Sequence, residues 1–544
     1  MDLVHTILAL LAAVIAAGVI EKALRLPLPR PLLQIGVGIA IGAVGGLGLT
    51  LDPEVFFLLF LPPLLFLDGW RIPREEVRRD AGPILELALG LVAFTVVGLG
   101  LLAHWAIPAL PLPVSFALAA VLAPTDPLAV TAIARRVRIP RRMMNILEGE
   151  ALLNDASALV CFRFAVAAAA SGAFEPAAVA LEFLWVAALG TGVGVGLAWA
   201  TSRARGWLGR AFADDSGILI LLSLLVPYAA YLVAAEIGAS GILAAVVAGL
   251  ALNFMDTTAL PLGHTRVRGN LVWDMIAYTA NGVIFVLLGE QMPAILGRAD
   301  AIAAYAGHDD PWWLALYILG MFLTLGLLRF VWVGLSLQLF LFRTKAAAPA
   351  ARLRLVAAMA VSGVRGAVTL AAVLSLPLLT AAGDAFPARD LAIFIAMGVI
   401  VASLLGATLL LPPLLAGVEM PTDDADEAAE DAAVVAAARA ALAAVERLQH
   451  VLARDNPRGD RVIHVAAQVM ETYHRRIARR DGEQVEGGRW ADGIEREMRL
   501  AALRAERVEI MRRVRNRELG SVTARRLIAA LDLLEARHSG ELQR

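Results

Sequence analysis

The sequence has little of what a disulfide-bonded, zinc-binding or nucleic-acid-binding protein needs. It holds one cysteine, Cys161, in 544 residues, so we expect no internal disulfide and no cysteine-based metal site. Charged residues make up only 18% of the chain and the formal net charge is −1, which gives no electrostatic basis for a nucleic-acid partner. The chain is therefore not expected to be a disulfide-bonded, zinc-binding or nucleic-acid-binding protein.

Apolar residues are abundant instead. The chain is 59% hydrophobic with a mean hydropathy of +0.71, more than a soluble protein of this size can bury, which predicts an all-α polytopic membrane protein. At roughly 20 residues per span, the apolar runs predict about 13 transmembrane helices, with 216–255 the least certain division. The first run opens with Asp2 and lacks a basic leader, so we do not expect a signal peptide. The runs lie at 3–21, 32–50, 54–70, 84–105, 113–134, 143–170, 178–201, 216–236, 238–255, 271–292, 312–342, 353–378 and 389–416.

Lys and Arg are distributed unevenly between the connections. Alternate connections carry basic groups, as at 71–79 and 135–142, whereas the intervening ones carry only Arg298 and Arg389. Because basic loops stay in the cytoplasm, this predicts an external N-terminus and a cytoplasmic C-terminus for a multi-pass protein of the cell (inner) membrane.

The composition changes after Pro413. Residues 417–544 are rich in Arg, Glu and Asp and contain no spanning run. Helical spacing at 425–454, 461–480, 490–518 and 521–538 predicts a cytoplasmic helical domain. We therefore expect a transmembrane domain at 1–416 and a regulatory helical domain at 417–544.

The most informative segment is 145–160, where acidic residues lie inside an apolar run. Glu150, Asn154 and Asp155 are spaced i, i+4 and i+5, so they share one side of a helix. A carboxylate at bilayer depth costs about 2.5–3.5 kcal/mol on insertion scales and usually lies on an ion or proton path. The segment predicts an ion- or proton-binding helix.

Two other spans contain helix-breaking sequences. Ala-Pro-Thr-Asp-Pro at 123–127 interrupts the fifth span, and Val-Ser-Gly-Val-Arg-Gly-Ala-Val at 361–368 interrupts the twelfth. An odd offset of seven spans gives the two opposite directions, as inverted repeats require. We expect two broken helices to cross, with Asp126 and Arg365 compensating the helix-end charges. A structural proline kink capped by Asp126 is the alternative.

Further polar residues have more than one interpretation. Arg329 is intramembrane and needs a carboxylate partner, for which Glu150 and Glu148 are the candidates. Asp68 ends the third span and belongs either to the interface or to the ion site. Asn281 and the glycine stripe at 190–196 are expected to serve helix packing. Arg163, Glu86, Glu182, Asp274 and Glu290 are expected at membrane interfaces.

Four of these segments together resemble the monovalent cation:proton antiporter 1 family, which includes the sodium/proton exchangers. They are Pro-Thr-Asp-Pro (124–127), Glu-Gly-Glu-Ala-Leu-Leu-Asn-Asp (148–155), Asn-Gly-Val-Ile-Phe-Val-Leu-Leu-Gly (281–289) and Gly-Val-Arg-Gly-Ala-Val (363–368), in the family's order. The resemblance covers about residues 5–415. It implies a homodimer, no cofactor, and an elevator-like movement of a core domain.

The resemblance also implies roles for individual residues. Asp155 matches the carboxylate that takes cation and proton in turn, and Asn154 the asparagine of the electroneutral branch. Thr125 and Asp126 match the unwound crossing helix beside the ion. Ala151 departs from the family, which often has a serine there whose hydroxyl can ligate the ion.

The other correspondences concern charge. Glu150 and Arg329 match a structural ion pair, Arg365 matches the arginine of the second crossing, and Asp68 falls close to an acidic position of the ion site.

The electrostatics of a buried carboxylate also favours the exchange of a cation for a proton. Burial disfavours the charged form of a carboxylate, so a proton and a cation compete to neutralise it. Oxygen ligands suit Na⁺, Li⁺ and K⁺ alike. One titrating carboxylate predicts electroneutral 1:1 exchange of Na⁺, or Li⁺ or K⁺, for H⁺ by a secondary antiporter rather than an enzyme. The alternatives are a K⁺-selective antiporter and a transport-inactive membrane sensor. A cation channel or an intramembrane aspartyl protease fits these motifs poorly.

Overall fold

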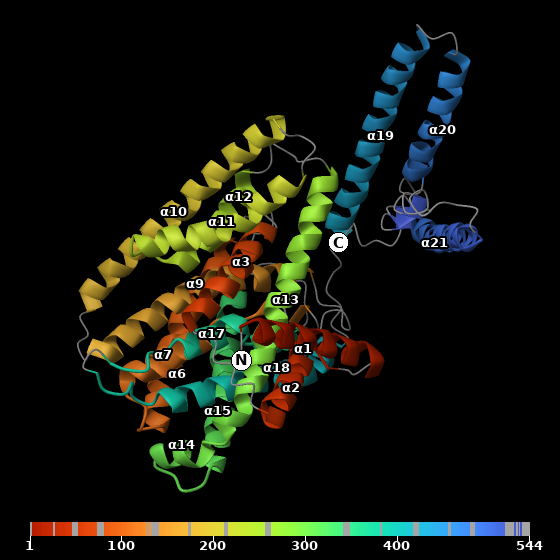
Figure 1. Cartoon of the computed structure of the whole chain (residues 1–544). Coiled ribbons are helices and arrows are strands. Elements are labelled where there is room, and N and C mark those ends of the chain that lie inside the picture. Colours follow the sequence, from red (N-terminus) through yellow and green to blue (C-terminus); the bar gives the residue numbers. More distant parts are fainter. Residues whose placement is uncertain are drawn as a thin grey trace. The chain divides into compact units, whose positions relative to one another are not determined.

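A computed structural model gives the structure of the chain (Figure 1). It describes residues 3–24, 28–45, 53–72, 81–127, 130–131, 141–171, 176–211, 216–255, 263–340, 349–380, 383–416, 424–454, 459–478, 485–516, 527–528, 531–532 and 534–535. In these ranges the regular elements are helices, apart from an isolated antiparallel bridge between Leu379 and Ala385. The chain divides into two compact units, Met1–Val418 and Glu419–Arg544.

The first unit is built from membrane-spanning helices. Among the described residues, 8 helices are long and apolar enough to cross a membrane, and the shorter apolar helices Arg30–Val44, Leu112–Leu122 and Gly241–Met255 accompany them. Each of the predicted apolar runs contains a described helix. The chain is therefore an all-helical membrane protein, as predicted, and the count of about 13 spans stays a prediction.

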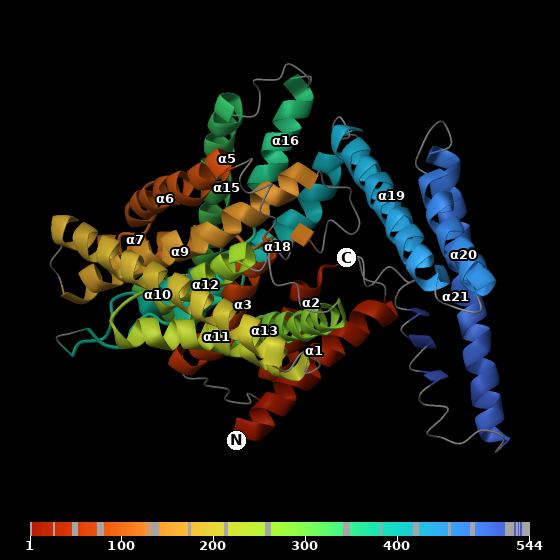
Figure 2. The same cartoon turned by 90° about the horizontal axis from the view of Figure 1, so that it is seen from above.

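One group of helices packs around α13, and we call it the α13 bundle. Figure 2 shows α1, α2 and α13 along one side of the unit. The closest approach joins α2 to α13: a side chain at Gly38 or Gly289 would collide with the backbone of the opposite helix. The bundle consists of α1 (Leu3–Leu24), α2 (Arg30–Gly45), α3 (Pro53–Arg71), α10 (Pro176–Ala211), α11 (Ser216–Glu236), α12 (Gly241–Met255) and α13 (Gly263–Leu296).

Most of the remaining helices of this unit form a second group that includes α9, and we call them the α9 bundle. α5, α6, α15 and α16 lie along the opposite side in Figure 2. The short helix α14 (Ala299–Tyr305) connects the two bundles in the chain. The bundle consists of α5 (Ala81–Leu85), the π-helix η1 (Glu86–Leu91), α6 (Val92–Ala106), α7 (Leu112–Leu122), α9 (Arg141–Ser171), α15 (Trp312–Phe340), α16 (Pro349–Val361), α17 (Ala367–Leu374) and α18 (Arg389–Leu415).

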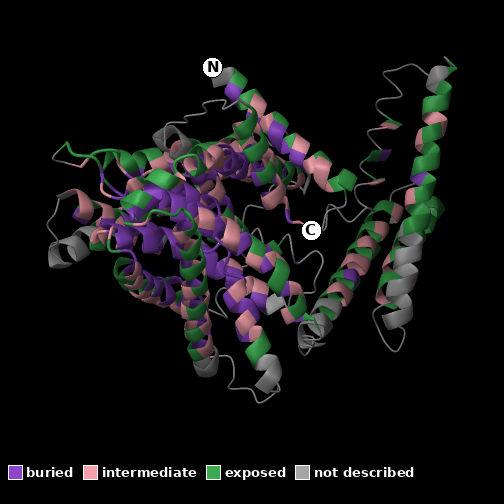
Figure 3. Ribbon diagram, turned by 90° about the horizontal axis from the view of Figure 1, so that it is seen from below, coloured by how far each residue is buried: buried purple, intermediate pink, exposed green. Residues whose placement is uncertain are grey.

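Contacts between the bundles concentrate on a few elements. α17 of the α9 bundle touches α3 and α13, α18 touches α2 and α13, and α9 touches α3 and α12. The buried residues gather in the interior of the first unit (Figure 3). α3, α9 and α17 therefore meet where the two bundles face each other.

The second unit consists of charged helices. α19 (Asp424–Arg454) and α20 (Gly459–Ala478) pack against each other, and α21 (Val485–Arg515) follows. Hydrogen bonds from Arg512 and Arg513 lower the pKa of Glu509 to about 2, so these pairs stay charged at neutral pH. Most of the predicted fourth helix, 521–538, lies outside the described residues.

Candidate functional site

Both broken helices lose their helical hydrogen bonding where the sequence predicts. α7 ends at Leu122 and residues 123–126 are not helical, while α16 ends at Val361 and α17 begins at Ala367. The two breaks meet: the backbone N–H of Asp126 donates to the carbonyl of Val364 at 2.7 Å. Backbone groups that the breaks release therefore bond across the crossing.

Arg365 caps two helix ends at this crossing. Its Nε donates to the carbonyl of Leu122 at 2.8 Å, at the end of α7, and its Nη1 donates to the carbonyl of Gly363, just beyond α16. Its backbone N–H donates to Ser403 Oγ of α18 at 3.0 Å. A cation at two carboxyl-terminal helix ends stabilises both partial negative charges.

Asp126 occupies the opposite electrostatic position. Its half-buried side chain lies against Gly366, which precedes α17, and a side chain in place of that glycine would collide with the carboxylate. The amino-terminal end of a helix carries partial positive charge, which favours an acidic neighbour. Glycine at 366 is required here by close approach.

A chain of polar contacts connects α9 with the crossing and with α15. Asn154 Nδ2 donates to Thr125 Oγ1 at 3.0 Å, and Thr125 Oγ1 donates to Glu150 Oε1 at 3.2 Å. Arg329 donates through Nη1 to Glu150 Oε1 and through Nη2 to Oε2, the latter at 2.7 Å. Arg329 Nε donates to the carbonyl of Met359 at 2.9 Å. The Thr125 hydroxyl thus links Asn154 to Glu150 by hydrogen bonds. Arg329 forms its ion pair with Glu150 rather than with Glu148.

This chain of bonds fixes which atom Asn154 leaves free. The guanidinium holds Glu150 as an acceptor, so the Thr125 hydroxyl must donate to it and the Asn154 amide must present its NH₂ group to Thr125. Asn154 is 1% exposed, and its Oδ1 accepts no hydrogen bond from the described residues. An uncharged acceptor oxygen therefore remains next to Asp155.

Asp155 itself is 9% exposed. The described residues form no hydrogen bond or ion pair with its carboxylate, and Asp68 and Asp126 lie close enough to interact with it electrostatically. Asp68 is exposed at the end of α3, and its charge also acts on Glu148 and Arg71. Within the described residues these acids do not form a metal-chelating group of three.

Glu150, Asn154 and Asp155 were expected to share one side of a helix, but helical geometry places Asp155 on a different face of α9 from the other two. At 3.6 residues per turn, Glu150, Asn154 and Ser157 share one face, and Glu148, Ala151 and Asp155 share another about 120° away. The first we call the bonded face, because Ser157 Oγ also lies 2.8 Å from the Ala88 carbonyl of η1. The second we call the open face.

Two acids that were expected at membrane interfaces are covered by protein. Glu290 is buried, and α13 continues beyond it to Leu296. Glu86 is half-buried and accepts a hydrogen bond from Ser336 at 2.8 Å. Ser403 and Ser157 were not predicted, because serines in membrane helices commonly bond only their own helix.

Other expectations concerned packing. Gly194 packs closely on α12 and Gly190 on Ser240, just before α12, whereas a side chain at Gly192 or Gly196 would meet open space. Half of the glycine stripe therefore serves packing in the described structure. Asn281 Nδ2 donates to Ala277 of its own helix at 2.9 Å.

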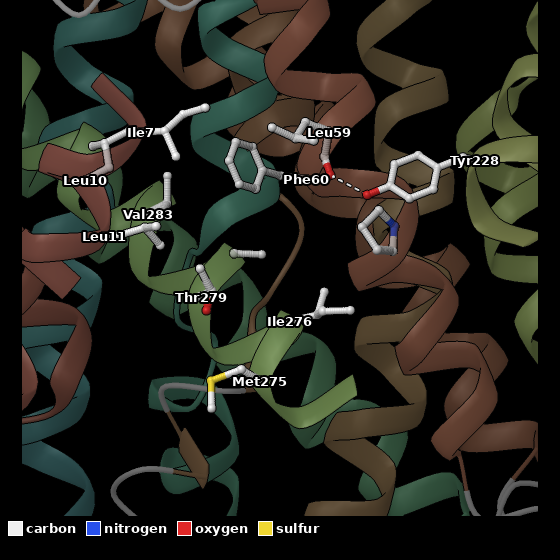
Figure 4. Close-up of a pocket in the computed structure, with 12 residues that line it drawn as sticks. Ile7, Leu10, Leu11, Leu59, Phe60, Tyr228, Met275, Ile276, Thr279 and Val283 are labelled. Atoms are coloured by element: carbon white, nitrogen blue, oxygen red, sulfur yellow. Dashed lines mark hydrogen bonds between the residues drawn. The ribbon is translucent and has the colours of Figure 1, made fainter. Parts of the chain in front are cut away.

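A cavity of about 330 Å³ opens away from these acids, in the α13 bundle (Figure 4). Helices α1, α3, α11 and α13 line it with apolar side chains, including Leu10, Phe60 and Val283. Tyr228 donates to the carbonyl of Leu59 at its edge, at 3.2 Å. A lining of this kind does not suit a cation, so the charged crossing is the candidate site.

Known proteins are similar to this chain in sequence and in fold. The chain matches the family described as sodium/hydrogen exchanger, transmembrane, over residues 8–417. It is 39% identical to the uncharacterized Na(+)/H(+) exchanger YjcE of Escherichia coli (strain K12), over 98% of this chain and 99% of that protein. It is 42% identical to the sodium, potassium, lithium and rubidium/H(+) antiporter of Bacillus pumilus (strain SAFR-032), over 76% of this chain and 61% of that protein.

A solved structure shares the fold. The sodium proton antiporter MjNhaP1 from Methanocaldococcus jannaschii, at pH 8, aligns with a TM-score of 0.57 and 18% identity, over 77% of this chain and 99% of that chain. The sequence match spans most of the chain, and the Escherichia coli relative matches nearly all of it. The chain therefore belongs to the Na⁺/H⁺ exchanger family and is a secondary transporter, not an enzyme, that exchanges monovalent cations for protons.

Proposed function

We propose that the chain exchanges Na⁺ for H⁺ across the cell membrane with Asp155 as the shared binding site. The observation that carries this proposal is that the Asp155 carboxylate is buried beside the helix crossing and has no hydrogen-bonding or ion-pairing partner among the described residues. A buried carboxylate is neutralised by a proton or by a cation, so the two compete for it. Asn154 Oδ1, Thr125, Asp126 and Asp68 are the nearby oxygen-bearing groups that we assign to cation binding.

We propose that exchange is electroneutral, one cation for one proton. On α9, Asn154 is uncharged and Glu150 is paired with Arg329, so we assign the exchanged proton to the buried Asp155 rather than to the partly exposed Glu148. Arg365 and Asp126 offset helix-end charges, and Glu150 with Arg329 holds the site together. Transport alternates access between the two sides as the α9 bundle moves against the α13 bundle in a homodimer.

K⁺ is the second candidate substrate. The Bacillus pumilus relative is named for sodium, potassium, lithium and rubidium. Ala151 offers no hydroxyl at the position where a serine is common, which leaves fewer protein ligands around the ion. A looser ligand set discriminates less between monovalent cations of different size.

Reconstitution tests the proposal. Purified protein in proteoliposomes with an internal pH dye should show pH changes when Na⁺, Li⁺ or K⁺ is added, and potassium-diffusion potentials set with valinomycin should leave the Na⁺-driven end point unchanged. A membrane potential does work only on net charge, about 2.3 kcal/mol per charge per 100 mV. An end point that follows the potential contradicts 1:1 exchange, and absence of any ion-driven pH change contradicts the function and favours a sensor.

We assign residues 417–544 to cytoplasmic regulation and 1–416 to exchange. The charged helices α19, α20 and α21 form a unit of their own, and the candidate site lies wholly in the first unit. A chain that ends at Gly417 should retain exchange with an altered pH profile. Complete loss of exchange by a stable truncated chain contradicts this assignment.

A further inference from the structure

Glu148 is a carboxylate of α9 that the exchange mechanism above does not use. It lies near the Arg141 end of the helix and is partly exposed. Its neighbour Glu150 is fully engaged by Arg329 and Thr125, whereas the described residues form no hydrogen bond or ion pair with Glu148. An acidic residue on a membrane helix that has no hydrogen-bonding or ion-pairing partner is expected to have a function.

Helical register places Glu148 on the open face, in line with Asp155. Seven residues are two helical turns, so the two carboxylates stand one above the other, about 10 Å apart along the axis. Ala151 and Leu152 both lie between them at this register, each about one turn from either acid. Ala151 contributes only a methyl group, and the side chain of Leu152 lies outside the described residues.

Asp68 links Glu148 to the candidate site from a second helix. It is exposed at the end of α3, and its charge acts on Glu148, on Asp126 and on Asp155. α3 contacts α9, so these acids come from two packed elements. Negative groups therefore run from Glu148 to Asp155, and Arg141, seven residues before Glu148, begins the same face of α9. Arg71 is the opposing charge at the end of α3, and it pairs with Asp274 at 2.6 Å.

We propose that Glu148 concentrates the transported cation beside Asp155, on the side of the candidate site that faces the Arg141 end of α9. Acidic groups along a cleft raise the local concentration of cations before they bind. Glu148 then sets the cation concentration at which transport is half-maximal, whereas Asp155 sets whether transport occurs. This inference rests on the proposed function of Asp155.

The test compares purified wild-type protein with Glu148→Gln and Glu148→Asp in proteoliposomes with an internal pH dye. Na⁺ is titrated at ionic strengths of about 0.01 M and about 1 M, set by choline chloride on both sides, where the screening lengths are about 30 Å and about 3 Å. Glu236→Gln is the matched control, because it removes the same charge from an exposed residue at the end of α11.

Glu148→Gln should raise the half-saturating Na⁺ concentration about two- to fourfold at low ionic strength, as Coulomb's law gives for charges about 10 Å apart in mostly aqueous surroundings. The maximal rate should stay at the wild-type value, and the difference should vanish at high ionic strength. Glu148→Asp and Glu236→Gln should match wild type under both conditions.

Three results overturn the inference: an unchanged half-saturating concentration at low ionic strength, an increase that persists undiminished at high ionic strength, or a fall in maximal rate. The first removes the steering role, and the other two assign Glu148 to binding chemistry or to structure. Failure of the proposed function looks different, because the wild-type protein would then show no Na⁺-driven pH change at all.

Discussion

The two polar faces of α9 differ in how many partners their side chains have. On the bonded face, Glu150, Asn154 and Ser157 all form hydrogen bonds to other elements of the α9 bundle. On the open face, the described residues form no hydrogen bond or ion pair with Glu148 or Asp155. One face of α9 thus carries polar side chains that are hydrogen-bonded to other residues, and another face carries two acids without such bonds.

The difference has an energetic meaning. Buried polar groups that are fully paired stabilise a fold, because removing one partner leaves the other desolvated and unpaired. A carboxylate without a protein partner contributes little to folding and remains available to bind a proton or a cation. Substitutions on the two faces should therefore separate into losses of stability and losses of transport.

The largest expected effect on transport comes from the open face. Asp155→Asn removes the titrating group but nearly preserves its shape, so exchange should fall to background while the melting temperature in detergent stays within a few degrees of wild type. Ion-driven pH change in proteoliposomes and thermal unfolding of the same preparation measure both. Normal exchange by a folded Asp155→Asn protein contradicts the assignment of the shared site.

The largest expected effect on stability comes from the bonded face. Glu150→Ala or Arg329→Ala leaves one buried charge without its partner, which should cost about 3–5 kcal/mol of folding free energy. Both residues are almost fully buried, so water cannot replace the lost partner. Reduced yield and a lowered melting temperature should follow. Two single variants that melt like wild type would show that the pair does not stabilise this bundle.

A smaller effect is expected where the crossing joins the bonded face. Thr125→Val keeps the side-chain shape but removes the hydroxyl that connects Asn154 to Glu150, which should cost about 1.5–3 kcal/mol because one acceptor is charged. The freed Asn154 amide should also rotate and weaken cation binding. Thr125→Ser restores the hydroxyl and is the control. Equal melting temperatures and equal half-saturating Na⁺ for Val and Ser variants would exclude this connection.

The sequence predicted which polar residues α9 carries, but it placed Asp155 on the same side as Glu150 and Asn154 and left their partners open. An intramembrane guanidinium requires a carboxylate, so the need of Arg329 for a glutamate was predictable. Glu148 and Glu150 are both within reach by sequence, and they point to opposite sides of α9. Only the tertiary arrangement that brings Arg329 of α15 to α9 decides that the partner is Glu150. The helix breaks were predictable as well, because proline and glycine act locally.

Features that depend on tertiary contacts were not predictable. Ser403 accepts the Arg365 N–H across from α18, and nothing in the local sequence of either residue indicates the other. The π-helix η1 has no proline or other local signal that distinguishes it from the α-helices around it. The burial of Glu290 was not predictable, because the end of an apolar run is a poor guide to the end of a helix, and α13 continues for more than a turn beyond it.

The smallest expected effect concerns Ser157, the last member of the bonded face. Its hydroxyl lies 2.8 Å from the Ala88 carbonyl in η1 and 3.0 Å from the Asn154 carbonyl of its own helix, and it can donate to one of them at a time. Ser157→Ala removes a neutral hydrogen bond, so it should cost about 1 kcal/mol, less than the loss at Thr125 or Glu150. Thr408→Val is a suitable control, because that hydroxyl donates at 2.7 Å to Leu404 of its own helix and so connects no other element.

Because Ser157 touches no titrating group, the half-saturating Na⁺ concentration and the maximal rate should stay at wild-type values in proteoliposomes. If Ser157→Ala loses transport without losing stability, Ser157 takes part in transport, and the division of α9 into a stabilising face and a transporting face is wrong.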